Sequence, residues 1–351
     1  MKDDIEKIIT DGIYAPSGEN CQPWRFVVKG NVIEVFNLPE LDKSLYNYKQ
    51  KGSYVAHGAL IENIVISASR RGYSSSVQIF PRAEENLISA ITLTKAEAKN
   101  EPLFPFVVKR HTNRKDHKQK KLNTEQKNAL TSAAKEGKLG ELTIIDDKVS
   151  MDKLGKALAV NEQVIFENKK LHDFFYEHIL WKEDDQYKAG GFYIKTLEFL
   201  PHQLKGVKLF KAWPILKLLN KIGKVSRVIA KENSEKYAKS GALGIITVNG
   251  NANKDYVNAG RVAERVWLTA TKLGISVHPC TGVLYFMENI RDHNEKEFSL
   301  EHQDAIRRAY ADIIKTFKVS GKTTPMLFRL GFAEEASAKA MRMNPEIKYL
   351  T

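Results

Sequence analysis

The chain has 351 residues, of which 42% are hydrophobic and 28% charged, and a formal net charge of +13. These proportions are ordinary for a globular protein and exclude disordered and fibrous classes. No run of about 18 uncharged apolar residues occurs, so the sequence predicts no transmembrane helix. The charged start at residues 1–5 is unlike a signal peptide, and the only two cysteines are Cys21 and Cys280. We therefore expect a cytoplasmic protein without a disulfide framework.

The positive charge lies in two short segments. Residues 204–231 hold eight basic residues and no acidic one, and residues 109–121 hold seven basic residues and one acidic one. The remainder of the chain is nearly neutral. Charge confined in this way argues against a nucleic-acid partner, which requires contacts to several phosphates. A metal site is not expected either, because the sequence contains no CxxC or HExxH pattern.

The first part of the chain has clear local signals. Isoleucines at 5, 8, 9 and 13 predict an amphipathic helix that ends near Tyr14. A loop over residues 15–20 follows it. The next expected elements are a hairpin over 25–36 that turns at 29–31, a helix over 54–72, strands over 77–80 and 88–94, and a connector over 101–106.

After the basic segment 110–121, Asn123 and Gln126 form a capping-box pattern that predicts the start of a helix. The elements expected beyond it are a strand over 142–146, a long helical stretch from 151, a strand over 240–248, a helix over 257–274, a strand beginning at 275–277, a helix over 299–317 and a strand over 325–332.

Two of these helices share a sequence pattern. Residues 54–63 align without gaps on residues 256–265, with Tyr-Val, Gly and Glu at matching positions, and the same offset pairs Gly72 with Gly274. Ordinary helix periodicity is the alternative explanation. We interpret the match as the sign of a duplicated half-domain.

The most informative motif is APSGENCQPWRF at residues 15–26. Its prolines, serine, glycine and asparagine make a preorganised loop that can face a planar, polar-edged ligand. On local chemistry alone, a plain helix-to-strand connector is the alternative. The stretch resembles the APSxxNxQPWxF signature of the nitroreductase superfamily, whose loop lies against the isoalloxazine ring of FMN. The resemblance implies that the loop binds the cofactor through Pro16, Ser17, Gly18, Asn20 and Gln22.

A second motif is RHTNR at residues 110–114. Alternation in an extended segment places both guanidinium groups and the threonine hydroxyl on one side, and guanidinium forks match phosphate oxygens. A solvated basic run is the alternative. The motif is similar to the RxSxR phosphate clamp of the same family, and to the RxTNR form of its Acg-like branch. This implies that Arg110, Thr112, Asn113 and Arg114 bind FMN, chiefly at its phosphate.

The C-terminal third adds two weaker resemblances. The strand around PMLFRLGFA at 325–333 and the following tail are similar to the family's closing strand and its basic tail, which implies that Arg342 reaches the flavin phosphate. The segment at 277–283 is placed like the strand and loop beside the flavin's pyrimidine ring. We therefore expect Pro279, Thr281 and Gly282 to lie next to the cofactor.

The resemblance implies an α+β, nitroreductase-like fold of two pseudo-symmetric halves. Each half would have a mostly antiparallel sheet flanked by helices, with residues 1–107 as the first half and 108–351 as the second. The first half has the loop but no RxSxR before it, and the second has the clamp but lacks Pro, Ser, Asn and Trp where its loop would be. One complete FMN site per chain follows, as in the Acg-like arrangement.

A helical lid insertion is expected at about residues 185–235. Its basic part, 204–231, interleaves apolar residues with lysines, which is typical of an amphipathic interfacial helix. A lid over the flavin pocket, a membrane-surface contact and an anionic partner are the three alternatives. Pro214 and Gly223 break the segment into short pieces, which favours the lid.

The implied activity is a ping-pong transfer of hydride from NAD(P)H, through flavin N5, to a small-molecule acceptor such as a nitroaromatic or a quinone. No catalytic side chain is expected, because the flavin carries the chemistry. NAD(P)H would bind transiently over the flavin, since no GxGxxG motif occurs. The alternative is a flavin-storage protein with little turnover. The protein is expected to be a monomeric pseudo-dimer or a higher homo-oligomer.

Overall fold

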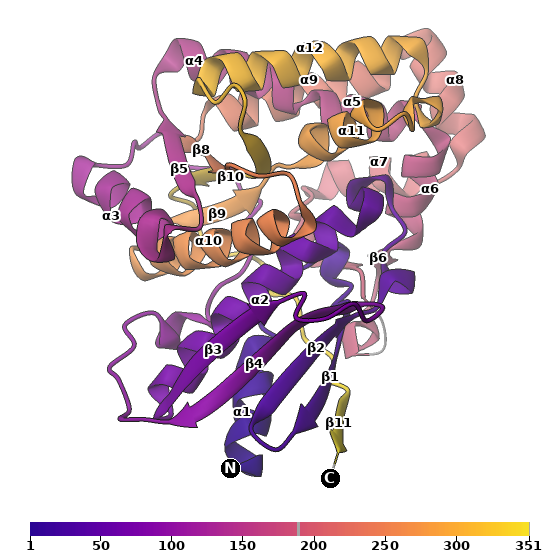
Figure 1. Cartoon of the computed structure of the whole chain (residues 1–351). Coiled ribbons are helices and arrows are strands. Elements are labelled where there is room, and N and C mark those ends of the chain that lie inside the picture. Colours follow the sequence, from indigo (N-terminus) through magenta and orange to yellow (C-terminus); the bar gives the residue numbers. More distant parts are fainter. Residues whose placement is uncertain (188–189, 351) are drawn as a thin grey trace.

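In the computed structural model, residues 1–187 and 190–350 are described, and two large sheets enclose a pair of long helices (Figure 1). The strands are β1 (Trp24–Lys29), β2 (Val32–Asn37), β3 (Tyr73–Ile79), β4 (Leu87–Lys95), β5 (Glu141–Ile145), β6 (Ile179–Leu180), β7 (Phe192–Tyr193), β8 (Ala242–Val248), β9 (Ser276–Pro279), β10 (Thr323–Gly331) and β11 (Ile347–Leu350). The α-helices are α1 (Lys2–Gly12), α2 (Lys51–Arg70), α3 (Thr124–Lys135), α4 (Lys148–Leu158), α5 (Val160–Glu167), α6 (Lys169–Glu177), α7 (Pro201–Phe210), α8 (Trp213–Gly223), α9 (Val225–Ala238), α10 (Asn253–Lys272), α11 (Gly282–Arg291) and α12 (Leu300–Phe317).

The two large sheets have equivalent strand orders. One contains β1-β2-β4-β3 and the other β5-β8-β10-β9, and neighbouring strands in both series are antiparallel. Along the chain, α1-β1-β2-α2-β3-β4 corresponds to α3-β5-β8-α10-β9-β10. The predicted α+β class, with antiparallel sheets flanked by helices, is confirmed.

Helices α2 and α10 cross at two glycines. A Cβ on Gly58 would lie 1.9 Å from the carbonyl oxygen of Val257, and one on Gly260 would lie 1.9 Å from that of Val55. The contact is reciprocal, and its partners are related by the same sequence offset that aligns the two helices. Only glycine lets the two backbones come this close.

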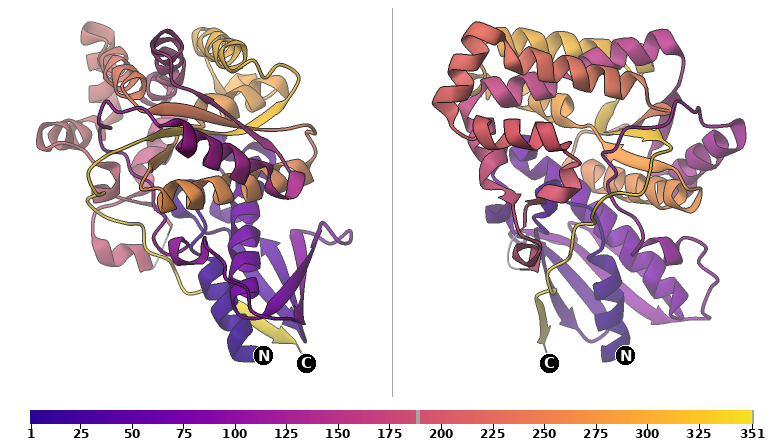
Figure 2. Two further views of the ribbon diagram at one scale, coloured as in Figure 1. Left: turned by 90° about the vertical axis from the view of Figure 1, so that its left-hand side faces the viewer. Right: turned by 180° about the vertical axis from the view of Figure 1, so that it is seen from behind.

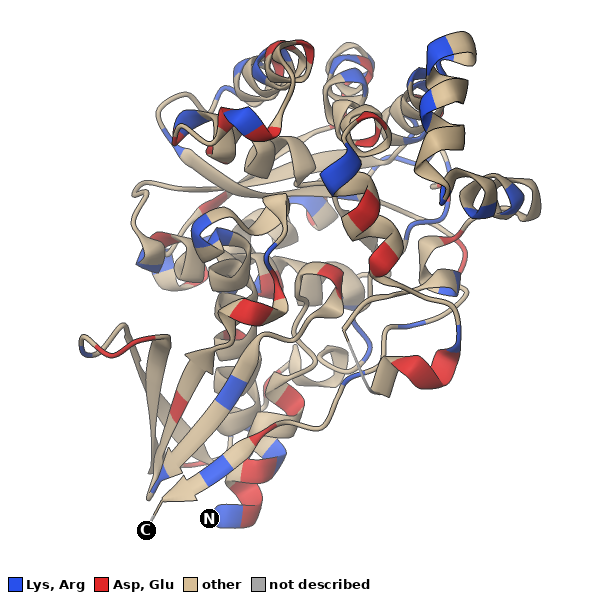
Figure 3. Ribbon diagram, turned by 90° about the vertical axis from the view of Figure 1, so that its right-hand side faces the viewer, with Lys and Arg blue, Asp and Glu red and all other residues tan. Residues whose placement is uncertain are grey.

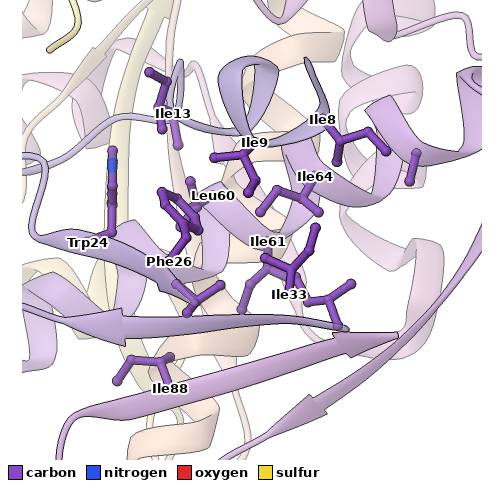
Figure 4. Packing of buried hydrophobic residues seen from close by; sticks show 14 of the residues in the cluster. Ile8, Ile9, Ile13, Trp24, Phe26, Ile33, Leu60, Ile61, Ile64 and Ile88 are labelled. Carbon is purple, nitrogen blue, oxygen red and sulfur yellow. The ribbon is translucent and has the colours of Figure 1, made fainter. Parts of the chain in front are cut away.

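The core of the first half explains the isoleucine pattern at the start of the chain. Ile5, Ile8 and Ile9 of α1 are buried against α2 and the inner face of the sheet, where they meet Leu60 and Phe26 (Figure 4). The helix ends at Gly12 and not near Tyr14. A Cβ on Gly12 would lie 2.6 Å from Cγ1 of Ile64, so α1 approaches α2 closely at this end.

The C-terminal tail crosses from the second half to the first. After β10 it runs from the second sheet past the central helices to the first sheet (Figure 2) and ends as β11, parallel to β1, with Phe26 paired to Ile347. This strand was not predicted, because its four residues carry no sequence signal of their own. It covers the edge of β1, whose backbone groups would otherwise be open to another strand.

The helical insertion is larger than predicted. It extends from Lys148 to Ala238, between β5 and β8, whereas the sequence indicated about 185–235. The long helical stretch expected from residue 151 consists of three helices, of which the last two are separated at Asn168, where the backbone leaves helical geometry and the side chain caps α6. Helices α11 and α12 form a second insertion between β9 and β10, and α11 was not predicted. No helix among the described residues is both long enough and apolar enough to cross a bilayer.

A buried histidine makes the stability of the first half depend on pH. Nε2 of His57 lies 3.0 Å from Oδ1 of Asn37, and burial lowers the pKa of His57 to about 3. Between that value and the ordinary pKa near 6.5, the unfolded chain binds the proton and the folded chain does not. Stability is therefore complete above pH 6.5 and falls, by up to about 1.4 kcal/mol per pH unit, as the pH drops toward 3.

We expect His57→Gln to remove this contribution, so that its free energy of unfolding changes less steeply between pH 6.5 and 4. Urea unfolding at a series of pH values measures the slope. His293→Gln is the control, because that side chain is not buried. Parallel slopes for wild type and His57→Gln would contradict the assignment.

Candidate functional site

A cavity of about 1250 Å³ lies where the helical insertion meets the two central helices. Its lining comes from the loop after α1, from α2 and α10, from the junction of β9 and α11, and from the insertion. The predicted site residues that line it are Pro16, Ser17, Gly18, Arg114, Pro279, Thr281 and Gly282. The other predicted residues lie outside the lining, among protein partners.

The loop after α1 has a strained backbone. Glu19, Asn20 and Gln22 have φ values of 45°, 59° and 50°, a region that side chains other than glycine rarely adopt. Each such residue costs on the order of 1 kcal/mol and persists only when its surroundings hold it. Oγ of Ser17 accepts a hydrogen bond of 3.0 Å from the backbone N–H of Gln22, which closes the loop from inside.

The tail holds the same loop from outside. Nδ2 of Asn20 donates to the carbonyl of Met341 at 3.0 Å, and the N–H of Met343 donates to Oε1 of Gln22 at 3.0 Å. The side chains of Asn20 and Gln22 are thus engaged with the tail and are not part of the cavity lining. They keep Pro16, Ser17 and Gly18 facing the cavity.

Arg342 fastens the tail to the end of α1. Its Nε donates to the carbonyl of Ile13 at 2.9 Å, its Nη2 to that of Tyr14 at 3.0 Å, and its Nη1 to Oδ1 of Asn20 at 2.9 Å. Burial, with the nearby charge of Arg110, lowers the pKa of Arg342 to about 9. A cation is favourable at carbonyls that end a helix. All three guanidinium nitrogens of Arg342 therefore have protein acceptors.

Arg110 is also bound within the protein. Its Nε forms a buried ion pair of 3.1 Å with Glu264, its Nη2 donates to the carbonyl of Tyr14 at 2.6 Å, and its guanidinium lies over the ring of Trp267. Burial raises the pKa of Glu264, and the charge of Arg110 opposes this. Arg110 and Arg342, far apart in sequence, therefore converge on the carbonyl of Tyr14.

The remaining residues of the second motif have different roles: Asn113 forms hydrogen bonds within the protein, whereas Arg114 lines the cavity. Asn113 donates its backbone N–H to Val277 at 2.9 Å and its Nδ2 to the carbonyl of Glu334 at 2.8 Å, which ties the segment to β9 and the tail. Thr112 is half-buried and does not line the cavity. Arg114 does line it, and its Nη1 donates to the carbonyl of Thr196 at 3.0 Å.

Arg114 brings a positive charge to the cavity wall. Burial lowers the pKa of Arg114 to about 10, so it stays charged at neutral pH. Burial raises the pKa of Glu19 well above its ordinary value, and the pKa of Asp42 is also raised.

The junction of β9 and α11 brings backbone close to the cavity. A Cβ on Gly282 would lie 1.8 Å from Oδ1 of Asn161, so a larger residue there would have to displace the Asn161 side chain. Burial raises the pKa of the Cys280 thiol to about 12 and lowers that of His278 well below its ordinary value. The first is therefore a neutral thiol and the second a neutral imidazole, although both line the cavity.

Sequence reasoning missed the cavity residues of the insertion. These are chiefly aromatic, with Phe174, Phe192, Phe199 and Phe210 in the lining, together with Glu162 and Tyr237. They belong to no recognisable motif, and an aromatic residue that lines a cavity has the same local pattern as one in a core. Helical spacing alone gives no means of finding them.

The basic segment 204–231 divides into two parts. Gly206, Val207 and Phe210 of α7 border the cavity, as the lid alternative requires. Among the described residues, α8 contributes nothing to the lining, and it exposes Leu218 and Ile222 by 58% and 71%. Lys and Arg recur along the helices of the insertion (Figure 3).

Comparisons with known proteins give distant likenesses. No protein-family model matches the chain. The chain is 22% identical, over 342 residues, to the uncharacterized protein MT1398 of Mycobacterium tuberculosis (strain CDC 1551 / Oshkosh). That alignment covers 96% of this chain and 47% of the relative, so the chain spans about half the length of the curated relative it matches.

Three solved structures that the chain is similar to are nitroreductases. A nitroreductase with bound FMN from Bacteroides fragilis is 12% identical with a TM-score of 0.36, over 69% of this chain and 96% of that one. The FMN-dependent nitroreductase NfnB from Mycobacterium smegmatis, in complex with NADPH, is 12% identical with a TM-score of 0.38, over 69% and 93%. A putative nitroreductase from Anabaena variabilis is 11% identical with a TM-score of 0.40, over 86% and 69%.

Proposed function

We propose that the protein is an FMN-dependent oxidoreductase of the nitroreductase type, which passes electrons from NAD(P)H to small acceptors. One observation carries the proposal: residues 16–18 of the loop whose strained backbone follows at residues 19–22, the cation of Arg114 and the backbone at Gly282 face a single cavity. These belong to three of the motifs that resemble the nitroreductase superfamily. They come from both halves of the chain, and strain of this kind is concentrated at functional sites.

The residues around the cavity suit a flat, anionic cofactor. Ala56 and Ala59 of α2, with Gly260 and Ala263 of α10, line one part with small side chains, which leave room for a planar ring. Arg114 supplies positive charge at the same cavity. Bound FMN would supply the hydride chemistry. Since Arg110 and Arg342 donate to protein carbonyls, we propose that Arg114 takes the larger part in binding the anionic end.

We propose one such site per chain, built from a duplicated half-domain. The equivalent strand orders and the reciprocal contact of Gly58 with Gly260 support the duplication. The loop is present only in the first half and the Arg-x-Thr-x-Arg motif only in the second. A complete site therefore needs both halves, which meet at the cavity.

The size and lining of the cavity support flat, apolar acceptors. Ligand pockets are usually about 300–1,000 Å³, so about 1250 Å³ leaves room for an acceptor beside the cofactor. The phenylalanines of the insertion, among them Phe174 and Phe199, favour nitroaromatics and quinones by ring contacts. NAD(P)H would occupy the same space before the acceptor enters.

Flavin storage is the second candidate function. It is favoured by the way the insertion covers the cavity: the carbonyl of Thr196 accepts from Arg114, and the backbone at Gly190 lies against Cys21. A cover fixed at both points would slow the exchange of substrates. The two candidates share the cofactor and differ in turnover.

The purified protein is expected to be yellow and to hold one FMN per chain. Anaerobic NADH or NADPH should bleach the flavin band, and a quinone or nitroaromatic should restore it. Arg114→Gln should lower the affinity for FMN at least about tenfold, the loss of one charge-assisted contact. Arg227→Gln is the control, because Arg227 is exposed and outside the cavity lining.

The outcomes separate the candidates. Flavin that binds but is not bleached by either nicotinamide would leave storage as the function. Protein that takes up no FMN on titration would overturn both.

A further inference from the structure

Four side chains on the insertion side of the cavity form a hydrogen-bonded chain. The hydroxyl of Tyr46 donates to Oδ1 of Asn161 at 3.1 Å, and Nδ2 of Asn161 donates to Oε1 of Glu162 at 3.3 Å. The hydroxyl of Tyr237 donates to the same Oε1 at 2.6 Å. They come from the short 3₁₀ helix Leu45–Gln50, from α5 and from α9, and all four line the cavity.

This chain of side chains adjoins the cofactor end of the cavity. Oδ1 of Asn161 occupies the space that a Cβ on Gly282 would fill. Gly282 belongs to the β9–α11 junction, which the proposed function places beside the flavin. Asn161 contacts that junction, and Glu162 is the next residue in the chain. Glu162 therefore lines the part of the cavity wall where an acceptor would meet the reduced cofactor.

Glu162 has no cationic partner among the described residues. Its Oε2 is buried without a hydrogen-bond partner. The titratable groups that face it are Tyr237 and Lys236 from α9, Cys280 from the β9–α11 junction, and Tyr46. Lys236 forms its ion pair with Asp116 instead.

The surroundings favour the protonated form of this carboxyl group, because no cation in the described part of the chain balances its charge and its Oε2 accepts no hydrogen bond there. Burial raises the pKa of Glu162, and burial also raises the pKa values of Tyr46 and Tyr237, so both phenols keep their protons. A carboxylate oxygen that is buried without a hydrogen-bond partner costs free energy. A protonated carboxyl at a cavity wall is typical of catalytic acids.

We propose that Glu162 is the catalytic acid of acceptor reduction, with Tyr237 and Asn161 as the positioning residues that orient its carboxyl group. The proposal rests on the proposed function and departs from the expectation that no side chain takes part in catalysis.

A quinone and a nitro group each need two electrons and two protons, which arrive as one hydride and one further proton. A quinone would take a hydride, supplied by the reduced cofactor, on one oxygen and a proton from Glu162 on the other: the carboxyl O–H bond breaks, two O–H bonds form on the quinone, and the product is a hydroquinone. A nitro group receives the same hydride and proton, one N–O bond breaks, and a nitroso compound and water leave. NAD(P)H is the source of the electrons, and water returns the proton to the Glu162 carboxylate.

The first test is independent of turnover. Infrared difference spectroscopy of the wild type and Glu162→Gln, at pH 7 and without cofactor, should show a protonated carboxyl band in the wild type that the substitution removes. Glutamine keeps an acceptor for Tyr237, so the variant should fold, and circular dichroism checks this. Glu177→Gln on the exposed side of α6 is the control and should keep the band. An ionised Glu162 at pH 7 would overturn the proposal.

The second test separates the two half-reactions by anaerobic stopped flow. In Glu162→Gln, bleaching by NADPH should stay within about twofold of wild type, whereas reoxidation by a quinone should be slower by about 100-fold. The wild-type reoxidation rate should fall as the pH rises through the raised pKa of Glu162, and the variant should show no such fall. Tyr237→Phe should move the pH midpoint and keep most of the rate.

Equal reoxidation rates in wild type and Glu162→Gln would overturn the catalytic role while leaving the proposed function intact. Failure of bleaching in both would overturn the proposed function, and the role of Glu162 with it.

Discussion

Gly58→Ala is expected to lower the free energy of unfolding by at least about 3 kcal/mol, at the upper end of what overpacking costs. The added methyl group would lie 1.9 Å from the carbonyl oxygen of Val257, on the backbone of the facing helix. A side chain could turn away from such a contact, but a helix backbone cannot. The two central helices would have to separate, and both sheets are packed against them. Urea unfolding followed by circular dichroism measures the change.

The reciprocal geometry supplies matched variants. Gly260→Ala should cost a similar amount, because its Cβ would meet the carbonyl of Val55 at the same 1.9 Å. Gly223→Ala at the end of α8 is the control, since nothing lies within 4 Å of its Cβ, and it should change stability by less than about 1 kcal/mol. A Gly58→Ala protein with a wild-type midpoint would show that the helices do not cross as described.

Arg110→Met is expected to destabilise the protein by about 3–5 kcal/mol, the usual cost of breaking a buried ion pair from one side. The side chains of Arg110 and Glu264 are only 2% and 0% exposed, so the substitution would leave a carboxylate that water cannot reach. Adding Glu264→Gln should recover part of the loss. Thermal and urea unfolding of both variants measure it.

Arg227→Met is the matched control, because the pair of Arg227 with Glu301 is exposed on both sides and should contribute less than about 1 kcal/mol. Flavin content per folded molecule adds a second readout. A normal FMN affinity in folded Arg110→Met would show that Arg110 has a structural role only. A loss of affinity larger than that of Arg114→Gln would contradict the proposal that Arg114 takes the larger part in binding FMN. A stability loss as small as that of Arg227→Met would contradict the buried pair.

Local sequence patterns predicted the helices, turns and caps that depend on interactions between residues close in sequence. The isoleucines of α1, the turn at Gly30 and the capping box at Asn123 each appear where the sequence indicated. The repeat of α2 in α10 identified the two helices that cross, because the close approach depends on glycine at one position in each. In the insertion, the breaks at Pro214 and Gly223 appear at the two ends of α8, whereas the break at Asn168 was missed, because that residue acts through its side chain as a cap.

Partners far apart in sequence could not be predicted. Asn20 and Gln22 were identified by their motif, but their hydrogen bonds to Met341 and Met343 depend on the path of the tail across the whole molecule. Arg342 was predicted to reach the flavin phosphate, and nothing in the sequence indicated that carbonyls just after α1 would accept its hydrogen bonds. Glu162 carries no motif, and its environment exists only once α5 and α9 have packed.

Strand β11 also decides when the first half can be completed during synthesis. Residues 1–95 leave the ribosome early, but the outer edge of β1 stays open until Ile347–Leu350 have been made. Through that interval the nascent chain presents an unpaired edge that strands of neighbouring chains can join. The strained loop also lacks its hydrogen-bond partners until then, because Met341–Met343 are synthesised just before the strand. Synthesis of residues 341–350 therefore closes the exposed edge and fixes the cavity loop in a single step, after both large sheets have been made.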